Sequence, residues 1–140
     1  MLPTRREGSV ACLARNKYGA KKIKDPASGY VFDSKAEFIR WCELRIMERA
    51  GLISDLKRQV TFELIPTQRA ESTEVYKAGP QKGLPKPGAV LEKPCSYVAD
   101  FTYYQNGEYI VEDVKGVRTE VFKLKKKLML YVHGIQVKET

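Results

Sequence analysis

Hydrophobic positions recur at helical spacing in two segments of the chain. Between residues 34 and 51 an apolar side chain returns every three or four positions, which predicts an amphipathic helix. A second helix is predicted over residues 120–132, with Thr119 as its N-cap and Gly134 as its stop. Its apolar stripe is expected to consist of Val121, Leu124, Leu128 and Tyr131.

The other regular patterns are typical of strands. Residues 60–65 and 97–105 are rich in β-branched and aromatic side chains. The Asn-Gly pair at 106–107 predicts a two-residue hairpin turn that leads into a strand over 108–115. A last strand is expected at 135–137. This order of elements predicts an α/β domain with a central mixed sheet and flanking helices.

Composition restricts the possible chemistry of the protein more than it restricts the possible folds. The 140 residues carry a net charge of +8, contain a single histidine and three scattered cysteines, and have no CxxC pair. These counts argue against a zinc finger, a disulfide framework and a His-based catalytic triad. Without a long apolar run, a cytoplasmic protein with no membrane segment is expected. Any chemistry must come from carboxylates, lysines and a hard metal ion.

Two segments are predicted to lie outside the regular elements. Residues 1–24 carry a net charge of +6 and few large apolar side chains, which indicates a flexible basic arm that precedes a domain over 25–140. That arm can contact phosphates or act as a solubilising tail. Residues 67–93 are rich in Gly, Pro and Lys, so no regular element is expected there. Loops of this length are usually functional or disordered.

The hairpin register brings two carboxylates together. With a two-residue turn, Asp100 lies opposite Asp113, on the same face of the sheet. Like charges at that spacing destabilise a sheet, so a shared proton, a basic side chain or a divalent cation must compensate. Lys115 lies on the same face, whereas Glu112 points to the other face, opposite Phe101. The alternative is a surface on which Lys115 merely neutralises two solvated aspartates.

Glu37 is a further candidate acid. Residues 34–37 match the capping box S-x-x-E, in which the glutamate only satisfies a backbone N–H. In the functional interpretation Glu37 points from the first helical turn toward the hairpin and completes an acidic site. The residues alone leave both interpretations open.

Carboxylates without histidine suit a hard cation such as Mg²⁺, for which Mn²⁺ can substitute. An adjacent lysine can orient a water or stabilise developing negative charge. Together with the basic charge, this predicts metal-dependent hydrolysis of a nucleic-acid phosphodiester, with DNA recognised by its backbone and shape. The candidate DNA-binding residues are Lys17, Lys21, Lys22, Lys123, Lys126 and Lys127.

The same residues carry a resemblance to a known group of enzymes. Residues 99–101 (Ala-Asp-Phe) and 112–116 (Glu-Asp-Val-Lys-Gly) resemble the catalytic core of the PD-(D/E)XK nuclease superfamily. Residues 32–37 (Phe-Asp-Ser-Lys-Ala-Glu) resemble the acidic first helix that precedes that core. Over about residues 16–138 the chain is similar to a family of small phage-encoded proteins, catalogued as a domain of unknown function and assigned to this superfamily.

The resemblance implies a restriction-endonuclease-like core in which the β-hairpin carries the site. It implies that Asp100, Asp113 and the backbone carbonyl of Val114 hold Mg²⁺ and that Lys115 positions the attacking water. Glu37 is then a further acid, acting directly or through a metal-bound water. Gln59 lies near this site or is simply a polar residue at a strand edge.

The resulting expectation is a phage DNA endonuclease that acts in the host cytoplasm. A structure-selective enzyme similar to Holliday-junction resolvases, with a role in recombination, replication or genome processing, is the favoured subtype. A homodimer would suit symmetric cleavage of two strands. The alternatives are a non-catalytic nucleic-acid-binding protein that retains the fold, and a structural or interaction protein of a phage particle or replication complex.

Overall fold

The computed structural model describes residues 21–140, so Lys17 and most of the predicted basic arm lie outside the described residues. The chain divides into two compact units, one ending at Trp41 and the other beginning at Cys42. Helix α1 (Lys35–Arg49) runs through this boundary, and it confirms the first predicted helix.

The first unit contains a small antiparallel ribbon. Strand β1 (Ile23–Lys24) pairs with β2 (Val31–Phe32), so residues 23–24, which were expected to belong to the basic arm, are in a strand. Phe32 is buried, and its ring lies 5.5 Å from that of Phe38 and 6.1 Å from that of Trp41. These aromatic contacts fix the ribbon against the first turns of α1.

The second unit is built on a four-stranded mixed sheet, as predicted. Its strands, in spatial order, are β3 (Ser54–Ile65), β6 (Cys95–Gln105), β7 (Glu108–Asp113) and β8 (Lys138–Glu139). Strand β6 pairs antiparallel with both β3 and β7, and β8 runs parallel to β7.

The last strand lies later in the chain than predicted. The expected strand at 135–137 is wrong, because the ladder with β7 pairs Glu112 with Lys138 and Asp113 with Glu139. Val137 contributes its buried side chain to the core instead. Strand β3, in contrast, begins earlier than predicted, at Ser54.

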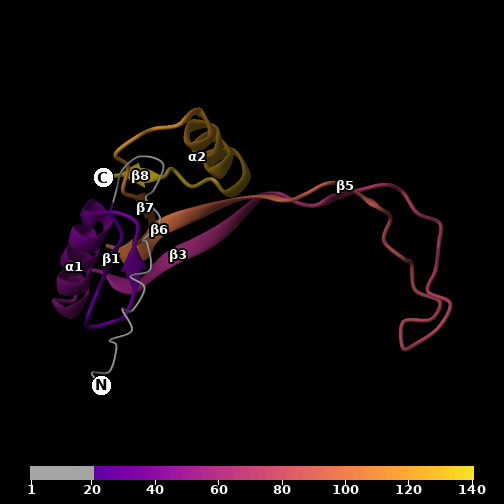
Figure 1. Cartoon of the computed structure of the whole chain (residues 1–140), viewed down its shortest axis with the longest axis horizontal. Coiled ribbons are helices and arrows are strands. Elements are labelled where there is room, and N and C mark those ends of the chain that lie inside the picture. Colours follow the sequence, from indigo (N-terminus) through magenta and orange to yellow (C-terminus); the bar gives the residue numbers. More distant parts are fainter. Residues whose placement is uncertain (1–20) are drawn as a thin grey trace, which may run out of the picture. The chain divides into compact units, whose positions relative to one another are not determined.

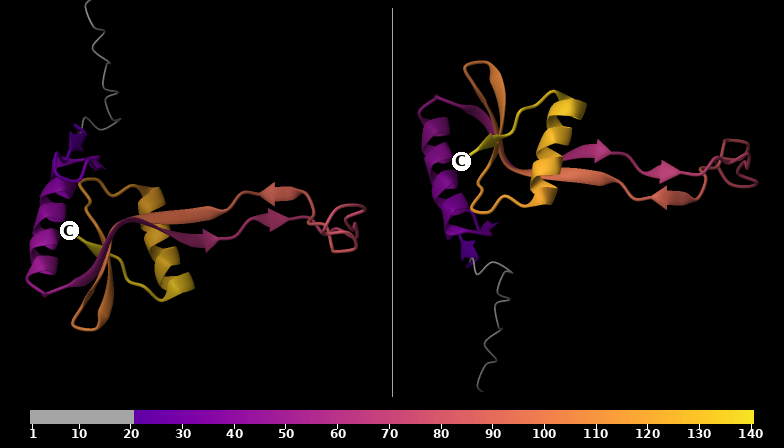
Figure 2. Two further views of the ribbon diagram at one scale, coloured as in Figure 1. Left: turned by 90° about the horizontal axis from the view of Figure 1, so that it is seen from below. Right: turned by 90° about the horizontal axis from the view of Figure 1, so that it is seen from above.

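Helix α2 (Glu120–His133) lies across β3 and β6 (Figure 2). Both of its predicted ends are confirmed: the Thr119 hydroxyl accepts a hydrogen bond from the Phe122 backbone N–H, and Gly134 is left-handed with φ 67°. The predicted stripe is right only at Leu128, which is partly buried and packs against the core, because Phe122 and Met129 are the buried residues of the helix. The helix has apolar side chains on several faces, and the members of the expected stripe that are exposed are Val121, Leu124 and Tyr131.

Residues 66–94 form a long β-ribbon rather than an irregular loop, so the expectation of no regular element there is wrong. It contains β4 (Gln68–Arg69), β5 (Val90–Glu92) and an antiparallel bridge between Val75 and Pro85. This β4–β5 arm prolongs β3 and β6 away from α2 (Figure 1). None of residues 66–94 is buried, so the arm lacks the alternation by which strands are recognised.

The sheet and α2 enclose the core of the second unit, which comprises Leu64, Tyr97, Ala99, Val111, Phe122, Met129 and Val137. Over residues 21–140, no helix is long and apolar enough to cross a membrane.

Candidate functional site

The β6–β7 hairpin has the turn and the register that the sequence predicts. Asn106 and Gly107 have φ values of 51° and 81°, as a two-residue turn of this kind requires. The ladder then pairs each residue from Gln105, opposite Glu108, back to Phe101, opposite Glu112. One further step along this register sets Asp100 against Asp113 at the end of β7.

Both aspartates are buried. Asp113 is 1% exposed and Asp100 is 9% exposed, so they do not lie on a solvated surface. The Asp113 Oδ2 accepts a hydrogen bond from the Tyr97 hydroxyl, and the Asp100 Oδ2 accepts one of 2.8 Å from the Val114 backbone N–H. The two carboxylates are therefore held by the strands that carry them.

Lys115 supplies positive charge at this position. Its Nζ lies 2.7 Å from the Asp113 Oδ1 and 4.7 Å from the centroid of the Phe122 ring. The last residue of the chain fixes the backbone here, because the Thr140 N–H donates to the Asp113 carbonyl and the Lys115 N–H donates to the Thr140 carbonyl. The structure thus places a basic side chain beside Asp113, which is one of the predicted ways to offset two opposed aspartates.

Sequence reasoning missed Tyr97. Burial, and then the hydrogen bond to Asp113, raises the pKa of the Tyr97 hydroxyl above its ordinary value of 10.0. The hairpin register does not indicate the contact, because Tyr97 precedes the part of β6 that pairs with β7. The available signal was chemical: a tyrosine in a strand expected to be buried needs an acceptor for its hydroxyl.

Glu112 has different surroundings from its neighbour. It is fully buried opposite Phe101, and its carboxylate accepts hydrogen bonds of 2.6 Å from the Tyr103 hydroxyl and 2.9 Å from the Thr140 hydroxyl. The consecutive carboxylates Glu112 and Asp113 thus bond to different side chains. This agrees with the period-of-two argument that separated them.

Glu37 makes contacts of the capping-box kind at the start of α1, although its carboxylate bonds to the residue before the Ser34 N-cap. Its backbone N–H donates to the Ser34 hydroxyl at 3.1 Å, and its Oε2 accepts from the Asp33 backbone N–H at 3.2 Å. Glu37 belongs to the first compact unit, whereas the β6–β7 hairpin belongs to the second. Its part as a further acid therefore stays a prediction.

Gln59 lies next to the carboxylates in the sheet. Arg58 pairs with Phe101 and Val60 pairs with Ala99, so the register position of Gln59 is opposite Asp100. Its φ of 54° is left-handed, which is uncommon for a residue other than glycine and costs on the order of 1 kcal/mol. Neighbouring strands thus set Gln59, Asp100 and Asp113 in one row.

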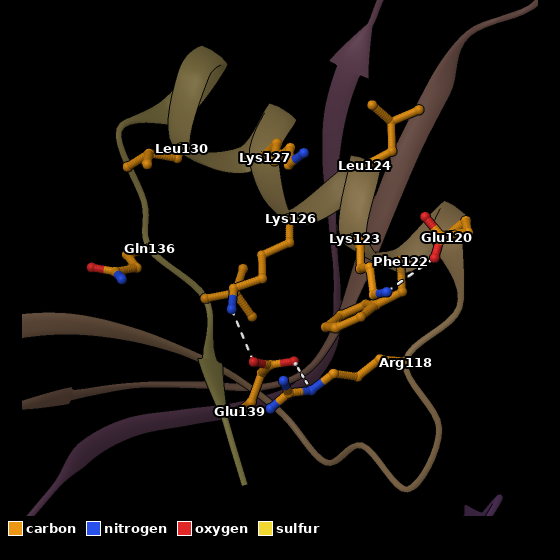
Figure 3. A pocket seen from close by; sticks show the side chains of 11 residues that line it. Arg118, Glu120, Phe122, Lys123, Leu124, Lys126, Lys127, Leu130, Gln136 and Glu139 are labelled. Carbon is orange, nitrogen blue, oxygen red and sulfur yellow. Dashed lines mark hydrogen bonds and ion pairs between the residues drawn. The ribbon is translucent and has the colours of Figure 1, made fainter.

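The candidate DNA-binding lysines of α2 border a separate pocket. This cavity of about 710 Å³ lies along α2 and the segment that leads into β8. Figure 3 shows Arg118 and Lys126 converging on Glu139, at 3.1 and 2.9 Å, while Lys123 pairs with Glu120. The pocket lining contains neither aspartate nor Lys115, although Phe122 contributes to both places.

The remaining candidate lysines are spread over both units. Lys127 also lines the α2 pocket and is exposed. In the first unit, Lys21 is exposed and the Lys22 Nζ lies 3.4 Å from the Asp33 carboxylate. Lys21, Lys22 and Lys127 are thus all exposed.

The carboxylates of the hairpin are oxygen ligands of the kind that hard divalent cations bind. Among the described residues no group of three or more His, Cys, Asp and Glu side chains is placed to hold a metal. Mg²⁺, however, is usually held by only one or two carboxylates, with water and substrate phosphates as its other ligands. The buried Asp113 Oδ1 makes an ion pair with Lys115 but no hydrogen bond, so it retains the capacity to bind a cation.

Comparison with known proteins gives a family but no activity. No curated protein and no solved structure matches the chain. A family model described as "Protein of unknown function (DUF1064)" matches residues 15–140. Because this match covers most of the sequence, the chain belongs to that family.

Proposed function

We propose that this protein is a Mg²⁺-dependent endonuclease that hydrolyses phosphodiester bonds in DNA, with a core of the PD-(D/E)XK type. The observation that carries the proposal is the pair of buried aspartates on adjacent strands, one of them ion-paired with Lys115. Apolar side chains in a sheet core generally stabilise it at least as well as buried charges do. Chemistry explains this arrangement better than stability does.

Each side chain has a role that follows from its contacts. Asp100 and Asp113 would hold the cation, with the Val114 carbonyl beside them. The Tyr97 hydroxyl and the Val114 N–H orient the two carboxylates, because each donates to one of their oxygens. When bound, a divalent cation supplies Lewis acidity and neutralises charge on the scissile phosphate.

Lys115 is suited to exchange partners during the reaction. Its side chain is 28% exposed, whereas that of Asp113 is 1% exposed, so the ammonium group faces the direction from which substrate can approach. A cation at Asp113 would compete with the ion pair and release Lys115. The freed ammonium would then orient the attacking water, and Glu37 is the candidate for a further acid.

The favoured substrate is branched DNA, recognised by its backbone, with a homodimer cutting two strands. The net charge of +8 supports a polyanionic partner. The subtype rests on the resemblance to small basic resolvases, which is an argument by analogy.

The test is a cleavage assay on a four-way junction, a flap and a matched linear duplex, each with Mg²⁺, Mn²⁺ or EDTA. Wild type is compared with Asp113→Asn, and Glu112→Gln is the matched control because it alters the adjacent buried carboxylate. We expect metal-dependent cutting by wild type and by Glu112→Gln, and at least about a 100-fold loss in Asp113→Asn. The ranking of substrates then defines the subtype.

Other results would favour the alternatives. Tight, salt-sensitive binding by every variant without any cutting would indicate a non-catalytic DNA-binding protein. Absence of both cutting and binding would indicate an interaction protein. Lys115→Met adds a further test: a catalytic lysine predicts loss of cleavage with metal binding retained or strengthened, because a competing cation has been removed.

A further inference from the structure

The β4–β5 arm is a ribbon closed by its own backbone hydrogen bonds, yet none of its residues is buried. Paired backbone groups occur along its length, including Ala70 N to Ala89 O at 2.9 Å and Lys86 N to Glu74 O at 2.8 Å. Near the tip, Gly83 N donates to Tyr76 O at 2.9 Å. A two-stranded ribbon with no buried face is only marginally stable alone. Contact with a partner would therefore stabilise the arm.

At Gly88 the two strands of the arm approach each other so closely that the position requires glycine. A Cβ at that position would lie 1.9 Å from the Ala70 carbonyl oxygen, so only glycine allows the two strands to approach here. The close approach occurs beside the hydrogen bond between Ala70 and Ala89. The arm is therefore a specific structure rather than a loop of arbitrary sequence.

Charge is distributed unevenly along the arm. Residues 75–86, at its tip, contain three lysines and no carboxylate, whereas its three glutamates all lie closer to the sheet. Lys86 pairs with Glu74 at 3.5 Å. In the described part of the chain, Lys77 and Lys82 have no ion-pair partner and both are exposed. The tip thus presents positive charge that the protein itself does not neutralise.

The edges of the arm are poorly suited to pairing with another protein strand. Pro80, Pro85 and Pro87 lie in or beside the tip, and each lacks the backbone N–H that strand addition requires. A two-stranded ribbon does fit the major groove of a DNA duplex. Unneutralised lysines at the end of such a ribbon are complementary to the phosphates that line the groove.

We propose that the β4–β5 arm binds duplex DNA, with Lys77 and Lys82 contacting backbone phosphates. The choice of DNA as partner rests on the proposed function. The arm would hold the duplex through contacts separate from Asp100 and Asp113. It would therefore contribute to affinity and position the substrate, and would take no part in bond cleavage.

The test measures binding without cleavage. Fluorescence anisotropy of a labelled duplex in EDTA, at several salt concentrations, compares wild type with Lys77→Gln, Lys82→Gln and the double variant. Lys57→Gln is the matched control, because Lys57 is an exposed lysine on β3, outside the arm, paired with Asp55. The logarithmic salt dependence should fall by about 0.9 for each lost phosphate contact, and should not change in the control.

Two results would overturn the proposal. One is an unchanged salt dependence in the double variant. The other is self-association: if shortening the arm converts a dimer to a monomer in sedimentation, while salt dependence per chain stays the same, the arm binds a second copy. Because the assay contains EDTA, its outcome is independent of catalysis. The two proposals can therefore fail separately. If the wild type never cleaves DNA but the tip variants bind DNA more weakly than it does, the proposed nuclease activity is contradicted and DNA binding by the arm is supported.

Discussion

Strand β6 takes part in two hairpins that differ in almost every respect. Toward its C-terminal end it turns through Asn106-Gly107 into β7, and this hairpin contains buried Asp113 and Glu112. Toward its N-terminal end it continues into the β4–β5 arm, none of whose residues is buried (Figure 1). The first hairpin is defined by packing, whereas the second is defined by backbone hydrogen bonds and by glycine and proline.

The contrast extends to similar ion pairs. Lys115 and Asp113 lie 2.7 Å apart, with the carboxylate buried, while Lys86 and Glu74 lie 3.5 Å apart and are both exposed. Exposed pairs contribute little to stability, because solvent screens them and both side chains lose freedom. A buried carboxylate depends strongly on its partners. Carboxylate–lysine proximity therefore indicates chemistry in the first hairpin and only local charge balance in the second.

Matched leucine truncations should show the largest difference between the two regions. Leu64, in β3, is 4% exposed and belongs to the core, whereas Leu84, in the arm, is 55% exposed. We expect Leu64→Ala to lower the free energy of unfolding by about 2–5 kcal/mol and Leu84→Ala by less than about 0.5 kcal/mol. Urea denaturation measures both. Comparable losses would show that the arm is packed against the rest of the protein.

Tyr97→Phe should have an intermediate effect, because it leaves the buried Asp113 Oδ2 without its donor. We expect the free energy of unfolding to fall by about 1–3 kcal/mol. Tyr76→Phe, in the arm, is the control and should change it little. A neutral result for Tyr97→Phe in thermal and urea denaturation would argue against a hydrogen bond that orients Asp113.

The same tyrosine predicts a pH dependence at alkaline pH. Its pKa is raised in the folded state above the ordinary 10.0, so above about pH 10 the unfolded chain loses this proton while the folded protein keeps it. Stability from this group is complete below pH 10 and decreases as pH rises further, by at most about 1.4 kcal/mol per pH unit. Chevron or urea measurements between pH 9 and 11 should show a smaller slope in Tyr97→Phe. Equal slopes would contradict the assignment.

Two glycine substitutions should have the smallest effects and should separate global from local changes. Gly107 has φ 81° with open space around it, so Gly107→Ala should destabilise the whole domain by about 1 kcal/mol through backbone strain. Gly88→Ala meets the Ala70 carbonyl and should open the arm without changing Tm. In Gly88→Ala, amide hydrogen exchange should show lost protection at Ala70 in the arm and unchanged protection in the β6–β7 hairpin. Global unfolding by Gly88→Ala would contradict an independent arm.

The sequence was sufficient where local chemistry determines structure. The Asn-Gly turn specifies a register, and the register alone set Asp100 opposite Asp113. Thr119 and Gly134 likewise determine the ends of α2. These features depend on residues close together in the chain, so no knowledge of the tertiary structure is needed to predict them.

Sequence was insufficient where tertiary contacts make the choice. Helix α2 has more than one apolar face, and packing buries Phe122 and Met129 rather than the predicted stripe. The Tyr97 hydroxyl contacts Asp113, and no pairing in the β6–β7 ladder predicts this hydrogen bond. The strands of the arm were not predicted, because a ribbon without a buried face has no hydrophobic period in its sequence. The first two failures share a cause, because in each the deciding contact is with residues distant in sequence.

The most direct test of the central claim is a binding titration of Mn²⁺, with free Mn²⁺ followed by electron paramagnetic resonance. It compares wild type, Asp113→Asn and Glu112→Gln, each first shown to be folded by circular dichroism. If Asp100 and Asp113 hold the cation, wild type and Glu112→Gln should bind alike, and Asp113→Asn should bind at least about 10-fold more weakly. Equal binding by all three proteins, or none by wild type, would contradict a metal centre in the β6–β7 hairpin.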